Sequence, residues 1–154
     1  MTGAQLAEVA REIIDANHYM TIASADEDGL PWASPVWFAA LDRREFFWVS
    51  DPHARHSRNI AARPQVSIVI FDSLVPINTG QGVYIAATAE QLEGAESERG
   101  IDVFSRRSQA QGAREWTTAD VLGAAPYRLY RATASQHWVL DPESSPDGRA
   151  PVTI

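Results

Sequence analysis

Residues 28–71 read DGLPWASPVWFAALDRREFFWVSDPHARHSRNIAARPQVSIVIF, and this segment carries most of the information about the fold. It begins with Asp28-Gly-Leu-Pro31, which predicts a tight turn because glycine tolerates the positive φ angle of hairpin turns. Runs of aromatic and β-branched residues follow at 34–38, 46–50 and 66–71, and turn residues separate the first two runs. The segment therefore predicts short antiparallel strands joined by hairpins.

The stretch from His53 to Arg63 is basic, although the whole chain has a net charge of -7. A local cluster of positive charge in a chain of negative net charge favours a bound anion. A solvated basic helix face is the alternative interpretation. Because Pro64 follows directly, we expect a short helix over 53–63 that ends before this proline.

The rest of the chain predicts further short elements. Apolar residues at i, i+3 and i+4 predict a helix over 4–17. Strands are predicted at 19–25, 32–41, 46–50, 66–71 and 82–92, with a final hairpin made of 127–133 and 136–140. A helical insertion is predicted over 95–123, and the tail over 141–154 is expected to be extended or disordered. Short strands at hairpin spacing imply one domain over 1–140, built as an antiparallel barrel or sandwich.

The composition excludes several classes of protein. The chain of 154 residues has no cysteine, which rules out disulfides, thiolate metal sites and a thiol nucleophile. All 13 basic residues are arginines, so a charged contact to an anion must come from arginine or histidine. No apolar run is long enough to span a membrane, the N-terminus lacks a signal peptide, and a pI near 5.0 argues against a nucleic-acid partner. We therefore expect a soluble, cytoplasmic protein.

The motifs, in their order and spacing, resemble the pyridoxamine 5'-phosphate oxidase-like family of flavin-binding split barrels. They are Asp28-Gly-Leu-Pro31, Ser34-Pro-Val-Trp37, Trp48-Val-Ser50, Ala54-Arg-His-Ser-Arg-Asn-Ile60 and Pro64-Gln-Val-Ser67. The resemblance extends over residues 19–140. It implies a mainly β (α+β) fold, a six-stranded antiparallel split β-barrel with a few flanking helices. It also implies bound FMN and a homodimer.

The basic segment is the predicted phosphate site. FMN presents a phosphate, a polar ribityl chain and a flat ring, so its site needs cations, hydroxyls or amide donors, and apolar walls. The candidate phosphate ligands are Ser50, Arg55, His56, Ser57 and Arg58. His56 stands where the family commonly has lysine, and an imidazole is only partly protonated near neutral pH.

Other candidate residues are implied by the resemblance to contact the flavin ring. The strand that carries Ser34, Val36 and Trp37 would lie with its backbone along the ring edge, and Val49 lies beside Ser50. Gln81 comes one residue before the position where the oxidases proper tend to carry glutamine. Trp138 is the candidate contact from the partner subunit, with a structural role as the alternative. Each aromatic residue of strands 34–38 and 46–50 has barrel packing as its alternative role.

We expect an FMN-dependent oxidoreductase that acts on an unknown small organic substrate, with a reduced nicotinamide as a candidate electron donor. No side chain is assigned a catalytic role, because the ring chemistry belongs to the cofactor. The insertion over 95–123 is a candidate cover for the open face of the flavin. The alternatives are a deazaflavin-dependent reductase, or a flavin or haem binding protein without turnover. His53 and His56 are spaced like metal ligands, but we expect no metal, and Asp26 and Asp28 are expected to serve the turn.

Overall fold

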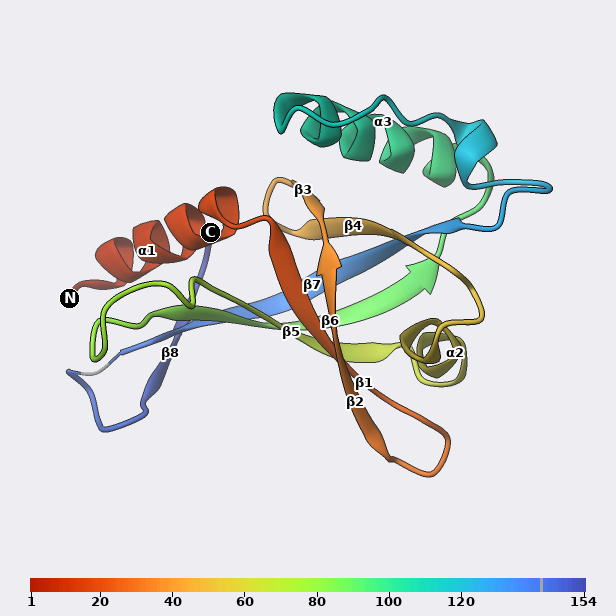
Figure 1. Ribbon diagram of the computed structural model, residues 1–154. Helices are drawn as coiled ribbons and strands as arrows, with labels where there is room; N and C mark the ends of the chain where they lie inside the picture. Colours follow the sequence, from red (N-terminus) through yellow and green to blue (C-terminus); the bar gives the residue numbers. More distant parts are fainter. Residues whose placement is uncertain (142) are drawn as a thin grey trace.

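The structure is a computed structural model that describes residues 1–141 and 143–154, and it shows a strongly curved antiparallel sheet with helices around it (Figure 1). The helices are α1 (Gly3–Ala16), α2 (Arg55–Ala62) and α3 (Gly94–Ala110), with a short 3-10 helix, η1 (Thr118–Asp120). The strands are β1 (Tyr19–Ala25), β2 (Pro31–Trp37), β3 (Ala39–Leu41), β4 (Glu45–Ser50), β5 (Gln65–Phe71), β6 (Gly82–Gln91), β7 (Arg128–Leu140) and β8 (Arg149–Val152).

The strand order explains how the sheet closes on itself. Neighbouring strands follow the order β2-β1-β5-β6-β7-β4-β3, and β8 pairs with the C-terminal part of β7. β2 and β3 therefore lie at opposite ends of the sheet, although only Phe38 separates them in the sequence. The chain itself joins the two edges at this buried residue, whose N–H donates to the His18 carbonyl at 3.2 Å. The predicted antiparallel split barrel with flanking helices is confirmed.

The number of strands differs from the six that the resemblance implies, with eight in the described residues. One predicted strand, 32–41, is divided at Phe38 into β2 and β3. The predicted final hairpin was wrong, because β7 is one continuous strand from Arg128 to Leu140. Ser135 is an extra residue in this strand, since Ala134 pairs with Ala87 and Gln136 with Ala86. A β-bulge absorbs one residue without ending the ladder, so a polar pair that reads as a turn can lie within a strand.

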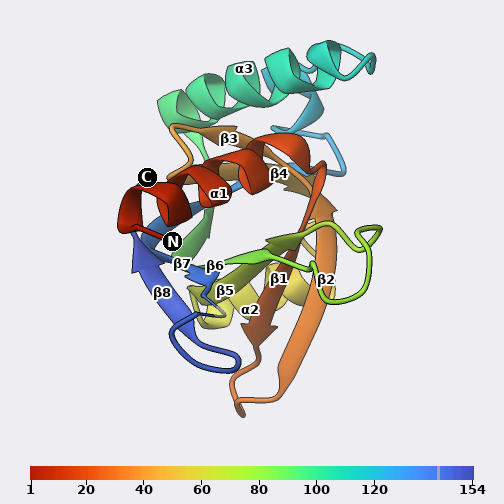
Figure 2. The same cartoon turned by 90° about the vertical axis from the view of Figure 1, so that its left-hand side faces the viewer.

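The tail over 141–154 contains ordered structure in its last part. Arg149–Val152 forms β8, which is hydrogen-bonded to β7, and Val152 is buried in the main core. Residue 142 lies outside the described residues. Figures 1 and 2 both show the C-terminus next to α1.

The main core fills the inside of the barrel. Inward-facing side chains of the strands, among them Ile22, Phe46, Trp48 and Ile85, are almost fully buried. Helix α1 lies across one end of the barrel, as Figure 2 shows, and Ala10 and Ile14 of its apolar stripe are buried. A capping box between Thr2 and Gln5 fixes the start of this helix.

A second apolar cluster lies outside the barrel, where α3 packs on β3 and β4. Its buried members include Phe47, Leu92, Ile101, Phe104 and Leu129. The helix approaches the sheet closely at Gly100, where a Cβ atom would lie 2.8 Å from a ring carbon of Phe47 and 2.9 Å from Leu129. Glycine at this position therefore lets α3 lie against the strands that carry the site.

Candidate functional site

A cavity of about 600 Å³ lies between the sheet, α2 and the segment around the end of α3. This volume is within the roughly 300–1,000 Å³ that small-molecule sites commonly have. The lining residues come from the β1, β2 and β4 strands, from α2 and α3, and from the segments that precede β7: Tyr19, Pro35, Val36, Trp37, Val49, Ser50, His56, Phe104, Ser108, Ala113, Arg114, Trp116 and Tyr127. We call this cavity the aromatic pocket.

The polar side of the aromatic pocket is formed where β4 ends and α2 begins. The Nε2 atom of His56 lies 2.8 Å from the hydroxyl oxygen of Ser50. Ala54 is the N-cap of α2 and offers no side chain to the free amides of the first turn, which also lacks an acidic residue. An uncapped helix N-terminus, with its free N–H groups and positive dipole end, favours a bound anion.

The environment of His56 favours the neutral form of its imidazole. The residue is buried, and this burial lowers the pKa of its imidazole below the ordinary value. The cause is loss of solvation, which penalises the charged form. A bound anion beside the ring would oppose this effect and favour protonation.

The other side of the pocket is a set of packed aromatic rings. Trp37 and Phe104 meet edge to face with centroids 4.7 Å apart, and Phe104 meets Trp116 in the same way at 5.4 Å. The indole N–H of Trp37 donates to the side-chain oxygen of Gln111 at 2.6 Å. These ring contacts and this hydrogen bond therefore hold the end of α3 and the segment after it against β2.

Five of the predicted site residues line the aromatic pocket, namely Val36, Trp37, Val49, Ser50 and His56. Ser34 lies earlier on β2, opposite Ile22 of β1, and does not line the cavity. Ser57 is buried and lines a separate cavity of about 280 Å³ with Tyr130.

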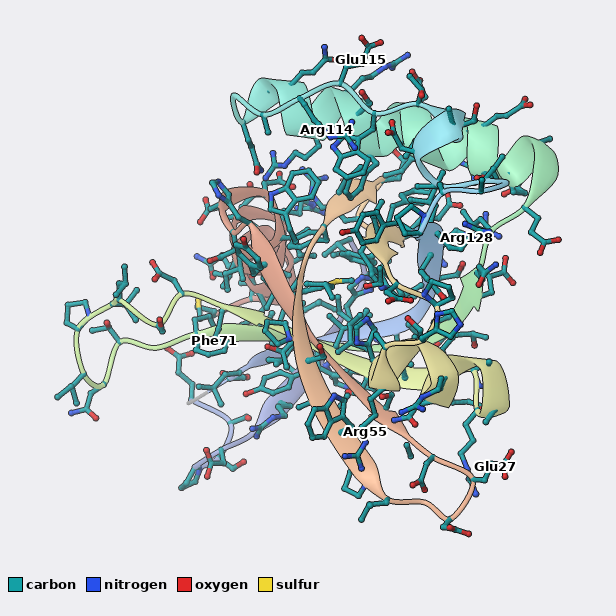
Figure 3. All side chains as sticks on the ribbon, turned by 45° about the vertical axis from the view of Figure 1, so that its right-hand side comes forward. Glu27, Arg55, Phe71, Arg114, Glu115 and Arg128 are labelled. Atoms are coloured by element: carbon teal, nitrogen blue, oxygen red, sulfur yellow. The ribbon has the colours of Figure 1, made fainter. Side chains whose placement is uncertain are left out.

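Arg55 and Arg58 line a different depression, of about 460 Å³, which also contains Asp26 and Asp28 of the β1–β2 turn. The guanidinium carbon of Arg55 lies 4.3 Å from the ring centroid of Trp32. In Figure 3, Arg55 lies beside β2 near the bottom of the view, whereas Arg114 lies near the top with the segment after α3. The structure thus does not bring Arg55 and Arg58 into the aromatic pocket.

Gln81 and Trp138 also lie away from this pocket. The side-chain amide of Gln81 donates to the Leu140 carbonyl at 2.8 Å and accepts from the Leu140 N–H at 2.9 Å, which adds a rung to the β6–β7 ladder. Trp138 is half-buried on β7, opposite Tyr84 of β6.

The remaining motifs have local roles in the structure. One carboxylate oxygen of Asp26 accepts from the N–H groups of Asp28 and Leu30, each at 2.9 Å, so this residue serves the turn as predicted. His53 is exposed and lies 3.0 Å from Asp51. No cluster of three or more potential metal ligands is found in the described residues.

The wall of the pocket formed by α3 and the segment after it was not among the predicted cofactor contacts. Phe104, Ser108, Arg114 and Trp116 belong to the predicted insertion over 95–123, which was considered only as a candidate cover. The sequence signal was an arginine two residues before a tryptophan in a segment otherwise poor in apolar residues. Aromatic and arginine residues in a loop commonly mark a binding surface.

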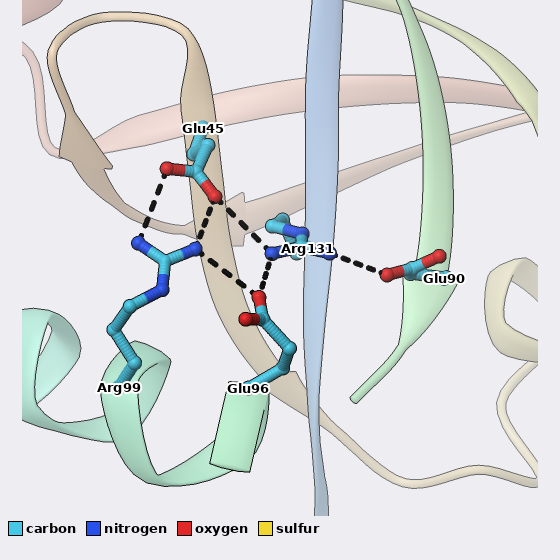
Figure 4. Close-up of polar contacts among 5 residues, drawn as sticks. All are labelled: Glu45, Glu90, Glu96, Arg99 and Arg131. Carbon is cyan, nitrogen blue, oxygen red and sulfur yellow. Dashed lines mark hydrogen bonds and ion pairs between the residues drawn. The ribbon is translucent and has the colours of Figure 1, made fainter. Parts of the chain in front are cut away.

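An ion-pair network holds α3 on the strands (Figure 4). Arg131 of β7 pairs with Glu45, Glu90 and Glu96, and Arg99 of α3 pairs with Glu45 and Glu96. The Arg131 side chain is only 15% exposed, so solvent screens these contacts less than it screens surface pairs. The pKa of the Glu45 carboxyl is lowered, mainly because Arg99 donates hydrogen bonds to it.

The fold and the pocket define a split-barrel protein with an aromatic cavity beside an uncapped helix. A family model described as pyridoxamine 5'-phosphate oxidase matches residues 6–141, and the chain belongs to this family. No curated protein matches the chain. No helix in the described residues combines the length and apolar character needed to cross a membrane.

Several solved structures share the fold. A haem binding protein from Mycobacterium smegmatis superposes with a TM-score of 0.73 at 20% identity, covering 99% of this chain and 58% of that one. HutZ, the haem storage protein from Vibrio cholerae, superposes with a TM-score of 0.66 at 22% identity, covering 85% of this chain and 91% of the HutZ chain. A FAD-binding protein from Mesorhizobium loti superposes with a TM-score of 0.62 at 19% identity, covering 86% of this chain and 92% of that one. The chain thus spans little more than half of the Mycobacterium smegmatis protein, and the likeness concerns the fold.

Proposed function

We propose that the protein is an FMN-dependent oxidoreductase, with the phosphate of FMN at the start of α2 and its ring in the aromatic pocket. The observation that carries this proposal is the uncapped first turn of α2, whose His56 lies with Ser50 of β4 on one side of a cavity with aromatic walls. The residues present suit the chemical parts of FMN, because they combine anion donors with flat apolar surfaces. When bound, FMN supplies the electron transfer, and the protein binds and orients it.

The phosphate would be held by several donors. Ser50 can donate its hydroxyl, and the first-turn amides of α2 point along the helix axis toward an anion. Protonated His56 adds a positive charge to this set. Arg55 lies in the same first turn and adds a fixed charge near the helix start while its guanidinium stacks on Trp32.

The ring edge would be recognised by the backbone of β2. This strand is the last in the hydrogen-bonded order of the described sheet, so the edge that faces away from β1 is not paired with another strand. Val36 and Trp37 lie on β2 and line the pocket, and they retain backbone N–H groups that Pro35 lacks. An unpaired strand edge can bind the alternating donors and acceptors of a flavin ring.

Haem is the second candidate ligand, and His56 is the observation that favours it. It is the histidine among the residues lining the pocket, and the neutral ring favoured by burial is the form that ligates iron. Two of the structural neighbours are described as haem proteins. If haem is the ligand, its iron would lie at His56, where the FMN proposal places a phosphate.

We also propose that the protein acts as a homodimer. Large apolar side chains of the β5 end and the β5–β6 loop are exposed in the single chain, with Leu74 at 90% and Ile77 at 91% exposure. Burial of such a patch favours association. Sedimentation at micromolar concentration should give a dimer, and a monomer that binds FMN at full occupancy would argue against a shared site.

Titration of the purified protein with FMN, riboflavin and haem tests the cofactor. FMN should bind at least about tenfold more tightly than riboflavin, because only FMN carries the phosphate. Ser50→Ala should reduce this ratio, and Ser145→Ala, in the exposed β7–β8 loop, should leave it unchanged. Equal affinities for FMN and riboflavin would rule out the proposed phosphate site. A haem spectrum that is lost in His56→Ala would favour the second candidate.

Turnover is tested with the FMN-loaded protein under anaerobic conditions. A reduced nicotinamide should bleach the flavin absorbance, and the colour should return when oxygen is admitted. Bleaching by dithionite alone would indicate a carrier or sensor instead of an enzyme with this donor.

A further inference from the structure

We infer that the wall of the aromatic pocket formed by Arg114, Trp116 and Phe104 is a substrate subsite for a planar aromatic carboxylate. This inference rests on the proposed function, since the substrate would share the pocket with the cofactor. The cofactor assignment uses β2, the end of β4 and the start of α2. The wall formed by α3 and the segment after it also carries a cation, Arg114, which this assignment leaves unused.

Arg114 is the cation of this wall, and its guanidinium lies over an aromatic ring. The guanidinium carbon is 3.7 Å from the ring centroid of Trp116. Both terminal nitrogens reach a single oxygen of Asp120, at 3.2 and 3.3 Å, and the second Asp120 oxygen accepts from the Thr117 N–H at 2.8 Å. Asp120 therefore holds the arginine at one side, and the Nε–H of Arg114 has no acceptor among the described residues.

The electrostatic setting of the pocket favours an anion. None of the lining residues in the described structure is acidic, although the chain has a net charge of -7. Two carboxylates lie near Arg114: Asp120 pairs with it at 3.2 Å on one side, and Figure 3 shows the Glu115 side chain at the outer side of the α3 segment, away from the sheet. The Arg114 side chain is 55% exposed and so remains accessible. A guanidinium fork in an apolar cavity selects a carboxylate by geometry as well as by charge.

The wall is held in place by two serines of α3. The hydroxyl of Ser108 donates to the Arg114 carbonyl at 2.7 Å, and the hydroxyl of Ser105 accepts from the Trp116 N–H at 2.8 Å. Both contacts fix the backbone of the segment that carries the arginine and the tryptophan. A binding group that is already ordered loses less entropy when a ligand binds.

The flat shape of the ligand follows from the rings. Trp37 and Trp116 each meet the buried Phe104 ring at nearly a right angle, 86° and 85°, and these two tryptophans are partly exposed. An aromatic ring can pack on one surface and present its edge to the next, as aromatic groups prefer. A carboxylate on that ring would then meet Arg114 beside Trp116.

The test compares 2-naphthoate with its neutral isostere 2-naphthamide, in FMN-loaded and FMN-free protein, by tryptophan fluorescence and flavin absorbance. The acid should bind about tenfold or more tightly than the amide. Arg114→Gln should abolish this preference while FMN affinity stays within about twofold of wild type. Arg106→Gln is the matched control, because Arg106 lies on α3 outside the pocket and pairs with Asp102.

The outcomes distinguish a failure of the substrate subsite from a failure of the cofactor proposal. Trp116→Leu should weaken both probes and keep the preference for the acid, since the arginine remains. Equal affinity of wild type for both probes, or an unchanged preference in Arg114→Gln, would overturn the inference. If FMN fails to bind while the acid preference persists in FMN-free protein, the subsite stands and the cofactor proposal fails.

Discussion

The imidazole Nε2 of His56 lies 2.8 Å from the hydroxyl of Ser50, at the point where β4 ends and α2 begins. Because burial lowers the pKa of His56, the ring gains its proton below its ordinary pKa of about 6.5 in the free protein. A bound phosphate raises that pKa, so FMN binding takes up a proton. The affinity for FMN should therefore increase as pH falls from neutrality to below about 6.5, as measured by fluorescence titration at several pH values.

The phosphate group titrates in the same range, with a second pKa of about 6, so a variant is needed as reference. His56→Gln retains a hydrogen-bonding side chain but cannot become charged. The difference between the wild-type and variant affinities should grow as pH falls. Two parallel pH profiles would place His56 outside the phosphate site.

A second buried histidine makes stability depend on pH. The pKa of His137 is lowered, mainly by burial, although a hydrogen bond at 2.9 Å to the Arg43 carbonyl opposes the shift. The unfolded chain then binds more protons than the folded one below about pH 6.5, so stability is present above that pH and is lost as pH falls toward the lowered pKa. Urea unfolding at several pH values should show a weaker pH dependence in His137→Gln. An identical slope in both proteins would contradict this prediction.

The strands and the start of the site were predictable because their signals are local. Asp28-Gly29 marks a hairpin by glycine geometry, and Gly29 has the expected positive φ of 85°. The family motifs likewise predicted Val36, Trp37, Ser50 and His56, which the fold brings into one cavity. These residues lie on or beside elements whose order in the sequence determines their position in the barrel.

The far wall of the pocket depends on contacts that the sequence does not show. Trp37 and Gln111 are separated by 74 positions, and their hydrogen bond depends on how α3 packs. The direction of Arg55 is also a tertiary outcome, since the guanidinium stacks on Trp32 of the neighbouring strand. Sequence spacing placed Arg55 in the correct helix turn but could not determine where its side chain points.

The close approach of α3 to the sheet predicts the effect of Gly100→Ala. A methyl group would lie 2.8 Å from Phe47 and 2.9 Å from Leu129, so the helix or these buried side chains must shift. Overpacking of this kind costs about 1–3 kcal/mol of unfolding free energy, against a gain of up to about 1 kcal/mol from helix propensity. Denaturant unfolding should show a net loss. Gly3→Ala, with open space around its new methyl, is the control and should not destabilise.

The ion-pair network should contribute measurably to stability. Arg131→Gln leaves Glu45 without one of its two arginine partners and removes the contacts of Arg131 to Glu90 and Glu96. We expect a loss of about 1–3 kcal/mol, because hydrogen bonds to charged groups in partly buried sites are stronger than neutral ones. Arg106→Gln removes an exposed pair and should change stability by less than about 0.5 kcal/mol. Equal losses in the two variants would show that the network acts only as surface charge.

Arg55→Ala tests whether the arginine acts through its charge or by direct contact. Its guanidinium stacks on Trp32 and lines a depression separate from the aromatic pocket. We therefore expect FMN affinity to fall by only about 0.5–1 kcal/mol, as for a charge at the rim, and the effect to diminish at high salt. Arg58→Ala, in the same depression, should cost less, since Arg58 lies beyond the first turn. A loss of about 2–5 kcal/mol that persists at high salt would instead show that Arg55 turns toward the phosphate and forms a buried pair with it.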